Sequence, residues 1–161
     1  MDRIYLDTNI LFYAFYSKKH PDKSKNAQNI ITNISKGVFI GVISFLVLLE
    51  IISGLRKLFF EELKTASIDS IETKTYDIIH KILRISYLEL FESKQKFSTI
   101  ELYSLLLVRH YPGEISPAGY KFIHPIDAMH IEIAKEAHCI ALYTAEKSFE
   151  KLGSEIPIRL I

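Results

Sequence analysis

Residues 4–11 of the chain read IYLDTNIL, a short apolar run that stops at an acid and leads into a second apolar run. A continuous apolar run of this length is typical of a parallel strand that is buried on both faces. Residues 7–9 supply turn and N-cap chemistry, so a helix is expected to begin here and to continue through Tyr16. The stretch therefore predicts a buried strand, a tight turn and a helix, which is the start of an α/β fold.

The remainder of the chain repeats this alternation of strand and helix, which favours an α/β fold around a mostly parallel sheet. Pro157 cannot donate to a strand ladder, so the last strand is expected at an edge of the sheet. The expected strands are residues 3–6, 38–43, 85–91, 140–143 and 156–161. The expected helices are residues 10–16, 22–34, one from Ser44 that carries Glu50, two between 55 and 85 divided near Ser67, 98–110, 126–138 and a short one from Thr144 to Gly153. Residues 111–125 are expected to form a loop rich in Gly, Pro and Ser.

Length and composition indicate a single globular domain that spans residues 1–161. The chain is 48% hydrophobic and 24% charged, which is ordinary for a folded domain and argues against disorder. Its formal net charge is +1, from 20 Lys and Arg against 19 Asp and Glu. A protein that gripped nucleic acid through nonspecific charge would be far more basic. If the chain acts on nucleic acid, its acids must serve the chemistry while a local basic surface holds the substrate.

Cysteine usage and hydropathy limit where the protein works. Cys139 is the sole cysteine, which excludes an intramolecular disulfide and a Cys-based zinc site, and its apolar neighbours predict a buried side chain. The N-terminus does not resemble a signal peptide. The apolar stretch of residues 38–52 is broken by Glu50 and falls short of the ~20 apolar residues that a membrane span needs. We therefore expect a soluble, cytoplasmic protein without a membrane partner.

Four acids occupy unusual positions. Asp7, Asp127 and Glu146 each come just after a predicted strand or early in the next helix. In a parallel sheet the carboxyl ends of the strands form the crevice where ligands bind, so these side chains can converge. Glu50 lies between the apolar stretches FLVLL and II, where a carboxylate needs solvent, a basic partner or a metal. Clustered carboxylates repel one another, and Mg²⁺ or Mn²⁺ would remove that repulsion and suit phosphodiester hydrolysis.

Each acid also has an ordinary structural interpretation when it is taken alone. Asp7 could be an N-cap, Asp127 and Glu146 could be first-turn acids favoured by the helix dipole, and Glu50 could be half of an ion pair. The joint pattern favours the metal site over these separate interpretations.

The motifs around the four acids resemble those of the PIN-domain nucleases. Residues 4–11 are similar to the family's opening motif, and residues 44–54 to its second motif, an apolar helix with a single glutamate. The most specific match is IDAMH at residues 126–130, which continues through the predicted strand into TAEKSF at residues 144–149. The small single-domain form looks most like the VapC-type toxins of toxin–antitoxin pairs.

This resemblance implies a three-layer α/β/α sandwich and a Mg²⁺- or Mn²⁺-dependent endoribonuclease, with Asp7, Glu50, Asp127 and Glu146 as its catalytic and metal-site acids. Asn9 and Thr144 match polar residues that support that site. The family usually has Asp where this chain has Glu146, whose reach is a methylene longer, so contact with the metal through water is expected there. The resemblance also implies an RNA substrate, a small antitoxin partner and a homodimer.

Two other functions remain open on the sequence. The chain could be a catalytically degenerate PIN-like RNA-binding or scaffold module, with Glu146 as its sequence support. It could also be a phosphatase with Asp7 as nucleophile, but such enzymes usually need a second Asp two residues on, where this chain has Asn9.

Several further residues have two interpretations. His130 follows Asp127 by one helical turn and could touch substrate or the metal's surroundings, although an interior helix histidine is commoner. The basic cluster Lys18, Lys19, Lys23 and Lys25 could hold an RNA backbone or form a solvated face. Tyr13, Phe15 and Tyr16 could stack on bases or belong to the core.

Overall fold

The computed structural model describes residues 1–16, 20–62, 67–94, 114–116, 119–121, 125–152 and 156–161. Its main sheet has five strands in the order β3-β2-β1-β6-β7, and all four pairings are parallel. These strands are β1 (Arg3–Leu6), β2 (Ile40–Ser44), β3 (Leu88–Phe91), β6 (Ala141–Thr144) and β7 (Ile158–Leu160). The predicted α/β fold class is confirmed, and so is the edge position of the last strand.

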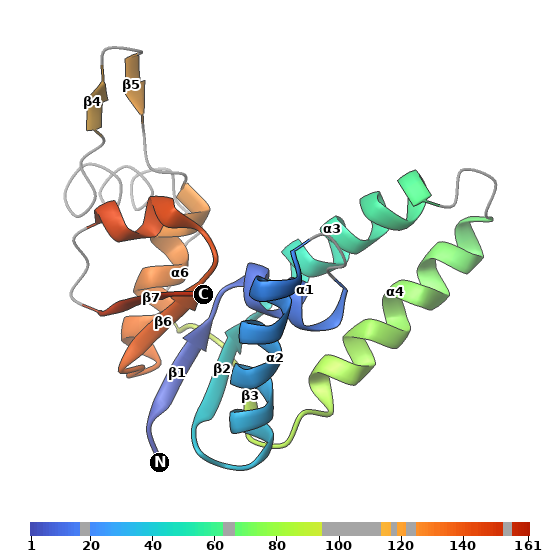
Figure 1. The fold of residues 1–161 in the computed structure, drawn as a ribbon, viewed down its shortest axis with the longest axis horizontal. Helices are drawn as coiled ribbons and strands as arrows, with labels where there is room; N and C mark the ends of the chain where they lie inside the picture. The colour runs from blue at the N-terminus through green and yellow to red at the C-terminus, as the bar shows by residue number, and fades with distance from the viewer. Residues whose placement is uncertain (17–19, 63–66, 95–113, 117–118, 122–124, 153–155) are drawn as a thin grey trace.

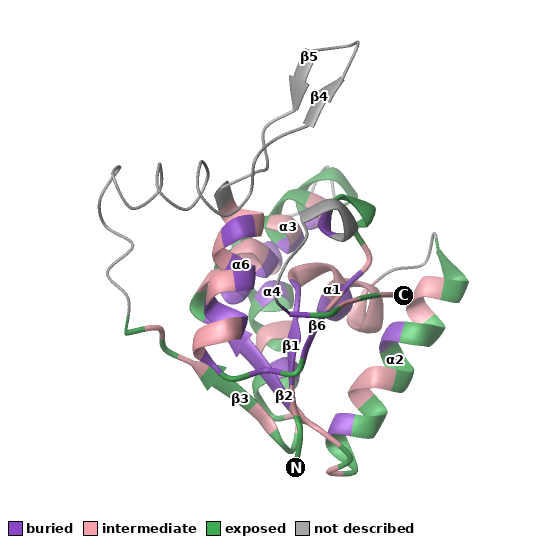
Figure 2. Cartoon of the chain, turned by 90° about the vertical axis from the view of Figure 1, so that its left-hand side faces the viewer, coloured by how far each residue is buried: buried purple, intermediate pink, exposed green. Residues whose placement is uncertain are grey.

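Helices cover both faces of this sheet, which gives the three layers that the family resemblance implies. Helix α2 (Pro21–Ser35) lies on one side of the sheet, and helix α6 (Pro125–Glu136) lies on the other (Figure 2). Helix α1 (Thr8–Phe15) packs against α2. Helices α3 (Phe45–Glu62) and α4 (Ile68–Leu83) form a pair that extends away from the sheet (Figure 1). A 3₁₀ helix, η1 (Lys147–Leu152), precedes β7.

The core is centred on β1, the middle strand. Tyr5 and Leu6 are fully buried there, as a strand covered by helices on both faces requires. Gly41 lets α2 approach β2 closely, since an added Cβ would lie 2.7 Å from Ile34 Cδ1. Gly37 follows the C-cap of α2 with a φ of 73°, which confirms the helix end predicted there.

The structure corrects three local expectations. The helix that carries Glu50 and the first of the two helices expected beyond residue 55 are one helix, α3, because Gly54 is tolerated within it. Helix α2 begins at Pro21, whose fixed φ suits the first helical position, one residue before the start expected at residue 22. The loop expected over residues 111–125 contains an antiparallel pair, β4 (Glu114–Ser116) and β5 (Gly119–Lys121).

The last predicted short helix is a 3₁₀ helix that begins at Lys147, because Thr144 is the final residue of β6. The helix expected at residues 98–110 lies outside the described residues. Within the described part of the chain, no helix is both long and apolar enough to cross a membrane. Cys139 is buried as expected, and burial raises the pKa of its thiol to about 11.

Candidate active site

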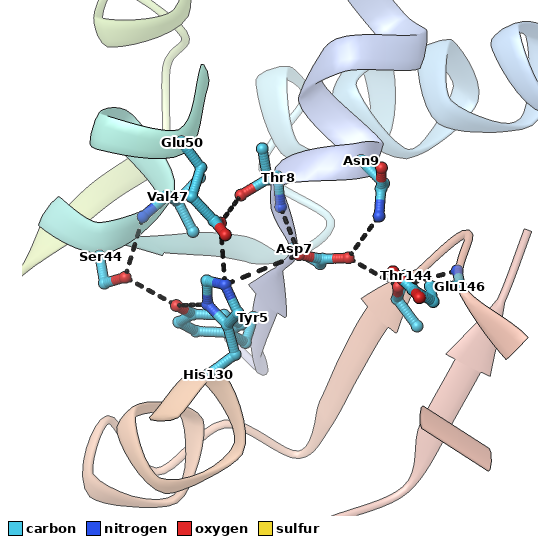
Figure 3. A network of polar contacts seen from close by, with 10 residues as sticks. All are labelled: Tyr5, Asp7, Thr8, Asn9, Ser44, Val47, Glu50, His130, Thr144 and Glu146. Atoms are coloured by element: carbon cyan, nitrogen blue, oxygen red, sulfur yellow. Dashed lines mark hydrogen bonds and ion pairs between the residues drawn. The ribbon is translucent and has the colours of Figure 1, made fainter. Parts of the chain in front are cut away.

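Asp7 directly follows β1 and is held at the carboxyl edge of the sheet. Its backbone N–H donates to the Tyr143 carbonyl of β6 at 3.0 Å, and its side chain is buried. Asp7 is the N-cap of α1, because its Oδ1 accepts a hydrogen bond from the Thr8 amide at 2.7 Å. Its Oδ2 accepts from Asn9 Nδ2 at 3.1 Å and from Thr144 Oγ1 at 2.7 Å (Figure 3). Three donors therefore fix the orientation of this carboxylate.

Glu50 reaches the same place from α3. Its side chain is 29% exposed, so the carboxylate lies at the boundary between the apolar helix face and solvent. Its Oε2 accepts a hydrogen bond from the Thr8 hydroxyl and lies 3.0 Å from His130 Nε2. Glu50 is therefore partly solvated and also contacts two side chains from other helices.

His130 lies between the two carboxylates, from helix α6. Its Nε2 is 3.0 Å from Glu50 Oε2 and 3.9 Å from Asp7 Oδ1, and the side chain is buried (Figure 3). One ligand atom from each of Asp7, Glu50 and His130 lies within 4.8 Å of the other two. The expected interior histidine is thus also part of the acidic cluster.

Tyr5 lies in β1, two residues before Asp7, and contacts this cluster through His130. Its hydroxyl is 2.9 Å from His130 Nδ1 and 2.7 Å from Ser44 Oγ. Burial raises the pKa of the Tyr5 phenol well above its usual value; the hydrogen bond with Ser44 lowers it somewhat, and the negative charges of Asp7 and Glu50 raise it further. The phenol therefore keeps its proton and can donate it in a hydrogen bond.

Asp127 and Glu146 are placed differently from the other two predicted acids. Asp127 is partly buried in the first turn of α6, one turn before His130 and on the same helix face. Glu146 is exposed just beyond β6, and its backbone N–H donates to Thr144 Oγ1 at 3.0 Å. Neither belongs to the three-residue group found among the described residues, so their roles at a metal site stay predictions.

The sequence of the chain matches one known protein family over most of its length. The family model of the PIN domain matches residues 4–155. The chain belongs to the PIN-domain family. The match includes all four predicted acids and every strand of the main sheet except β7 and the first residue of β1.

This PIN domain also resembles two solved structures along almost its full length. One is VapBC2 from Rickettsia felis bound to a DNA fragment from its promoter. The sequence identity is 20%, the TM-score is 0.60, and the alignment covers 98% of each chain. The other is the DNA-bound VapBC of Salmonella typhimurium, with 18% identity, a TM-score of 0.59 and coverage of 99% of this chain and 98% of that one. A comparison with curated proteins gave no match. At these identities the two structures establish a shared fold.

The donor atoms of this PIN domain suit a divalent cation. Asp7 and Glu50 offer carboxylate oxygens, which Mg²⁺ and Mn²⁺ prefer, and the imidazole of His130 is a donor type that transition metals accept. Asp7 also lies at the N-terminus of α1, the end of a helix where anions and the cation-binding groups of a site are commonly placed.

The basic and aromatic residues after the first motif differ in their surroundings: some contact the site or the core, and others are exposed. Lys23 Nζ donates to the Ala145 carbonyl at 3.2 Å and lies 5.4 Å from the centre of the Tyr13 ring, so its charge is next to the segment with Glu146. Lys25 is exposed, and Lys18 and Lys19 lie outside the described residues. Tyr13, Phe15 and Tyr16 pack against the core, which confirms that interpretation of the aromatic residues.

Sequence reasoning did not find the hydrogen-bond partners of Glu50. Thr8 and His130 are 42 and 80 positions away from it, and Tyr5 and Ser44 connect to it through His130. One signal was available in the sequence: a tyrosine in an otherwise aliphatic buried strand needs a partner for its hydroxyl. The identity of that partner depends on the packing of α6, which the sequence did not specify.

Proposed function

We propose that this PIN domain is a divalent-metal-dependent endoribonuclease. The observation that supports it best is the convergence of Asp7 and Glu50, with His130, at the carboxyl edge of the parallel sheet. Two carboxylates from separate elements repel one another there, and in a parallel sheet this edge is where ligands bind. Cation binding gives a reason for that arrangement.

In this proposal Asp7 and Glu50 hold Mg²⁺ or Mn²⁺, Asp127 completes the acid set from α6, and Glu146 acts through water. The exposed position of Glu146 fits a contact through water better than direct coordination. A bound cation of this kind polarises a phosphoryl oxygen and lowers the pKa of a bound water. Asn9 and Thr144 keep the Asp7 carboxylate oriented, and Thr8 does the same for Glu50.

Lys23 offers a site for the RNA backbone. Its ammonium group lies beside the Ala145 carbonyl, directly before Glu146. A lysine in this position can contact a phosphate while the acids face the scissile bond. A local positive charge of this kind is consistent with a net charge of only +1 for the chain.

We further propose that the protein is the toxin of a toxin–antitoxin pair and works in the cytoplasm as a homodimer. The similarity in fold to chains of two VapBC complexes supports this role. Coexpression with a small neighbouring reading frame should give a complex that copurifies and has no ribonuclease activity. Light scattering of the separate protein should give twice the 18.6 kDa mass of the chain. A neighbouring product that neither binds nor inhibits would contradict the toxin assignment.

Cleavage of a broad RNA panel tests the catalytic proposal. The purified protein should cut RNA with Mg²⁺ or Mn²⁺ and should stop when EDTA is added. Asp7→Asn and Asp127→Asn should each lose the activity, and Asp7→Asn keeps the N-cap of α1 because Asn caps helices as well as Asp does. Asp77→Asn, an exposed position on α4, is the matched control and should cut normally. Folded protein that leaves every RNA intact with either metal would overturn the proposal.

The exposed position of Glu146 also supports a second candidate, a PIN-like RNA-binding or scaffold module without catalysis. Such a module would bind RNA without cutting it and would bind no divalent cation at the cluster. Metal titration by calorimetry separates the two candidates.

A further inference from the structure

A continuous series of hydrogen bonds runs from the first turn of α3 to Glu50. The Val47 amide is 3.4 Å from Ser44 Oγ, which is 2.7 Å from the Tyr5 hydroxyl. That hydroxyl is 2.9 Å from His130 Nδ1, and His130 Nε2 is 3.0 Å from Glu50 Oε2 (Figure 3). The series starts and ends on the same helix and passes through β1 and α6 between these ends.

The chemistry of the two ends sets the direction of every bond in between. The Val47 amide can only donate and an ionised Glu50 can only accept, whereas each hydroxyl and a neutral imidazole has one proton to donate. Ser44 then accepts from Val47 and donates to Tyr5, and Tyr5 donates to His130 Nδ1. His130 keeps its proton on Nε2 and donates it to Glu50. Every proton in this order has an acceptor.

The reverse order leaves two groups without suitable partners. With the His130 proton on Nδ1, the lone pair of Nε2 would face the Glu50 oxygen at 3.0 Å, so that two acceptors oppose each other. Tyr5 would then donate to Ser44, whose own proton would have no acceptor among the described residues. Ser44, Tyr5 and His130 are all buried, where an unsatisfied polar group is costly.

We propose that His130 is a positioning residue that donates to Glu50, held in the Nε2-protonated form by Ser44 and Tyr5, and is not a ligand of the metal. The proposal rests on the proposed function in taking Glu50 as part of the metal site. With His130 as donor, the protein ligands of the cation are oxygen atoms alone, which suits Mg²⁺ and Mn²⁺ better than Zn²⁺. A histidine ligand would instead need the Nε2 lone pair and the reverse order of protons.

Nitrogen-15 NMR of histidine-labelled protein tests the direction of the series without any metal or RNA. The chain has six histidines, and the His130 signals are assigned by their absence in His130→Gln. Metal-free wild-type protein should show His130 protonated at Nε2 alone. Tyr5→Phe removes the donor to Nδ1, so the Nδ1 signal should shift, while Glu50 still keeps the proton on Nε2. Tyr143→Phe, on the neighbouring strand, is the matched control because its hydroxyl makes no hydrogen bond within the described residues, and it should match wild type.

Three outcomes would overturn the proposal: a proton on Nδ1 in wild type, a doubly protonated ring, or an unchanged His130 signal in Tyr5→Phe. Because this readout needs no catalysis, it decides the proposal even where the nuclease assay fails.

Manganese affinity, measured by calorimetry, separates a positioning role from direct coordination. His130→Gln can place an amide donor against Glu50, so it should bind Mn²⁺ within about threefold of wild type, whereas His130→Leu should lose about 10- to 100-fold. Equal losses in the two variants would show that the imidazole itself binds the metal and would contradict the proposal. Absence of Mn²⁺ binding in every protein, wild type included, would count against the proposed function and leave the NMR result to decide the role of His130.

Discussion

Asp7 and Glu50 face each other in the site but are held by different kinds of contact. Two of the three donors to Asp7 are Thr8 and Asn9 in its own turn, whereas Glu50 contacts residues 42 and 80 positions away. The Asp7 side is therefore organised as soon as the turn after β1 forms and β6 pairs with it. The Glu50 side requires α3 to pack against both α1, which carries Thr8, and α6, which carries His130. Changes that loosen α6 should therefore affect Glu50 first.

The largest expected effect is on the rate of RNA cleavage, and it should be the same for Asp7 and for Glu50. Asp7→Asn and Glu50→Gln should each lower the rate of RNA cleavage by at least about 100-fold, since a lost metal contact removes several kcal/mol of transition-state stabilisation. The double variant should be no slower than either single variant, because both residues serve one cation. Single-turnover cleavage measures the three rates.

Glu61→Gln, an exposed position on the same helix as Glu50, is the control and should retain the wild-type rate. Additive losses in the double variant would mean that the two acids act independently, and the shared site would then be wrong.

A smaller effect is expected from the strand contact to Asp7. Thr144 is fully buried and donates to Asp7 Oδ2 at 2.7 Å. Thr144→Val preserves the shape but removes the donor, so the free energy of unfolding should fall by about 1–3 kcal/mol. Thr144→Ser keeps the hydroxyl and should lose less. Urea unfolding measures both variants, and a valine variant as stable as wild type would show that this bond does not hold Asp7.

The smallest effect is expected where Glu50 meets Thr8. Thr8 is only partly buried, and His130 still contacts Glu50 when the Thr8 hydroxyl is removed. Thr8→Val should therefore lower the free energy of unfolding by about 1 kcal/mol or less. Thr8→Ser should behave as wild type. A loss in Thr8→Val as large as that in Thr144→Val would remove the distinction between the two sides of the site.

The parts of the fold that sequence reasoning predicted are those with local causes. The buried strand at residues 3–6, the Asp7 turn, the Gly37 helix end and the edge position after Pro157 each follow from short-range patterns and backbone chemistry. The expected division between two helices near residue 55 was wrong, because α3 continues through Gly54 to Glu62 and a single glycine is tolerated within a helix. The β4–β5 pair was missed because its three-residue strands are too short to show periodicity.

In the candidate site, too, the residues found from the sequence are those with local motifs, and the contacts that depend on tertiary packing were missed. Asp7, Asn9 and Thr144 were singled out from their motifs, and the structure brings them together. Glu50 was singled out because its apolar surroundings needed a partner, but that partner could not be named. His130 reaches Glu50 only through the position of α6 against β2 and β6, which is a tertiary property. A single sequence contains little information about such a contact.

Calorimetric titration of the metal-free protein with Mn²⁺ tests the central claim most directly. The account predicts saturable binding in wild type and in Asp77→Asn, and loss of that binding in Asp7→Asn, whose helix cap is retained. Wild-type protein that binds no Mn²⁺, or an Asp7→Asn variant that binds it as tightly as wild type, would contradict the assignment of this acidic cluster as a metal site.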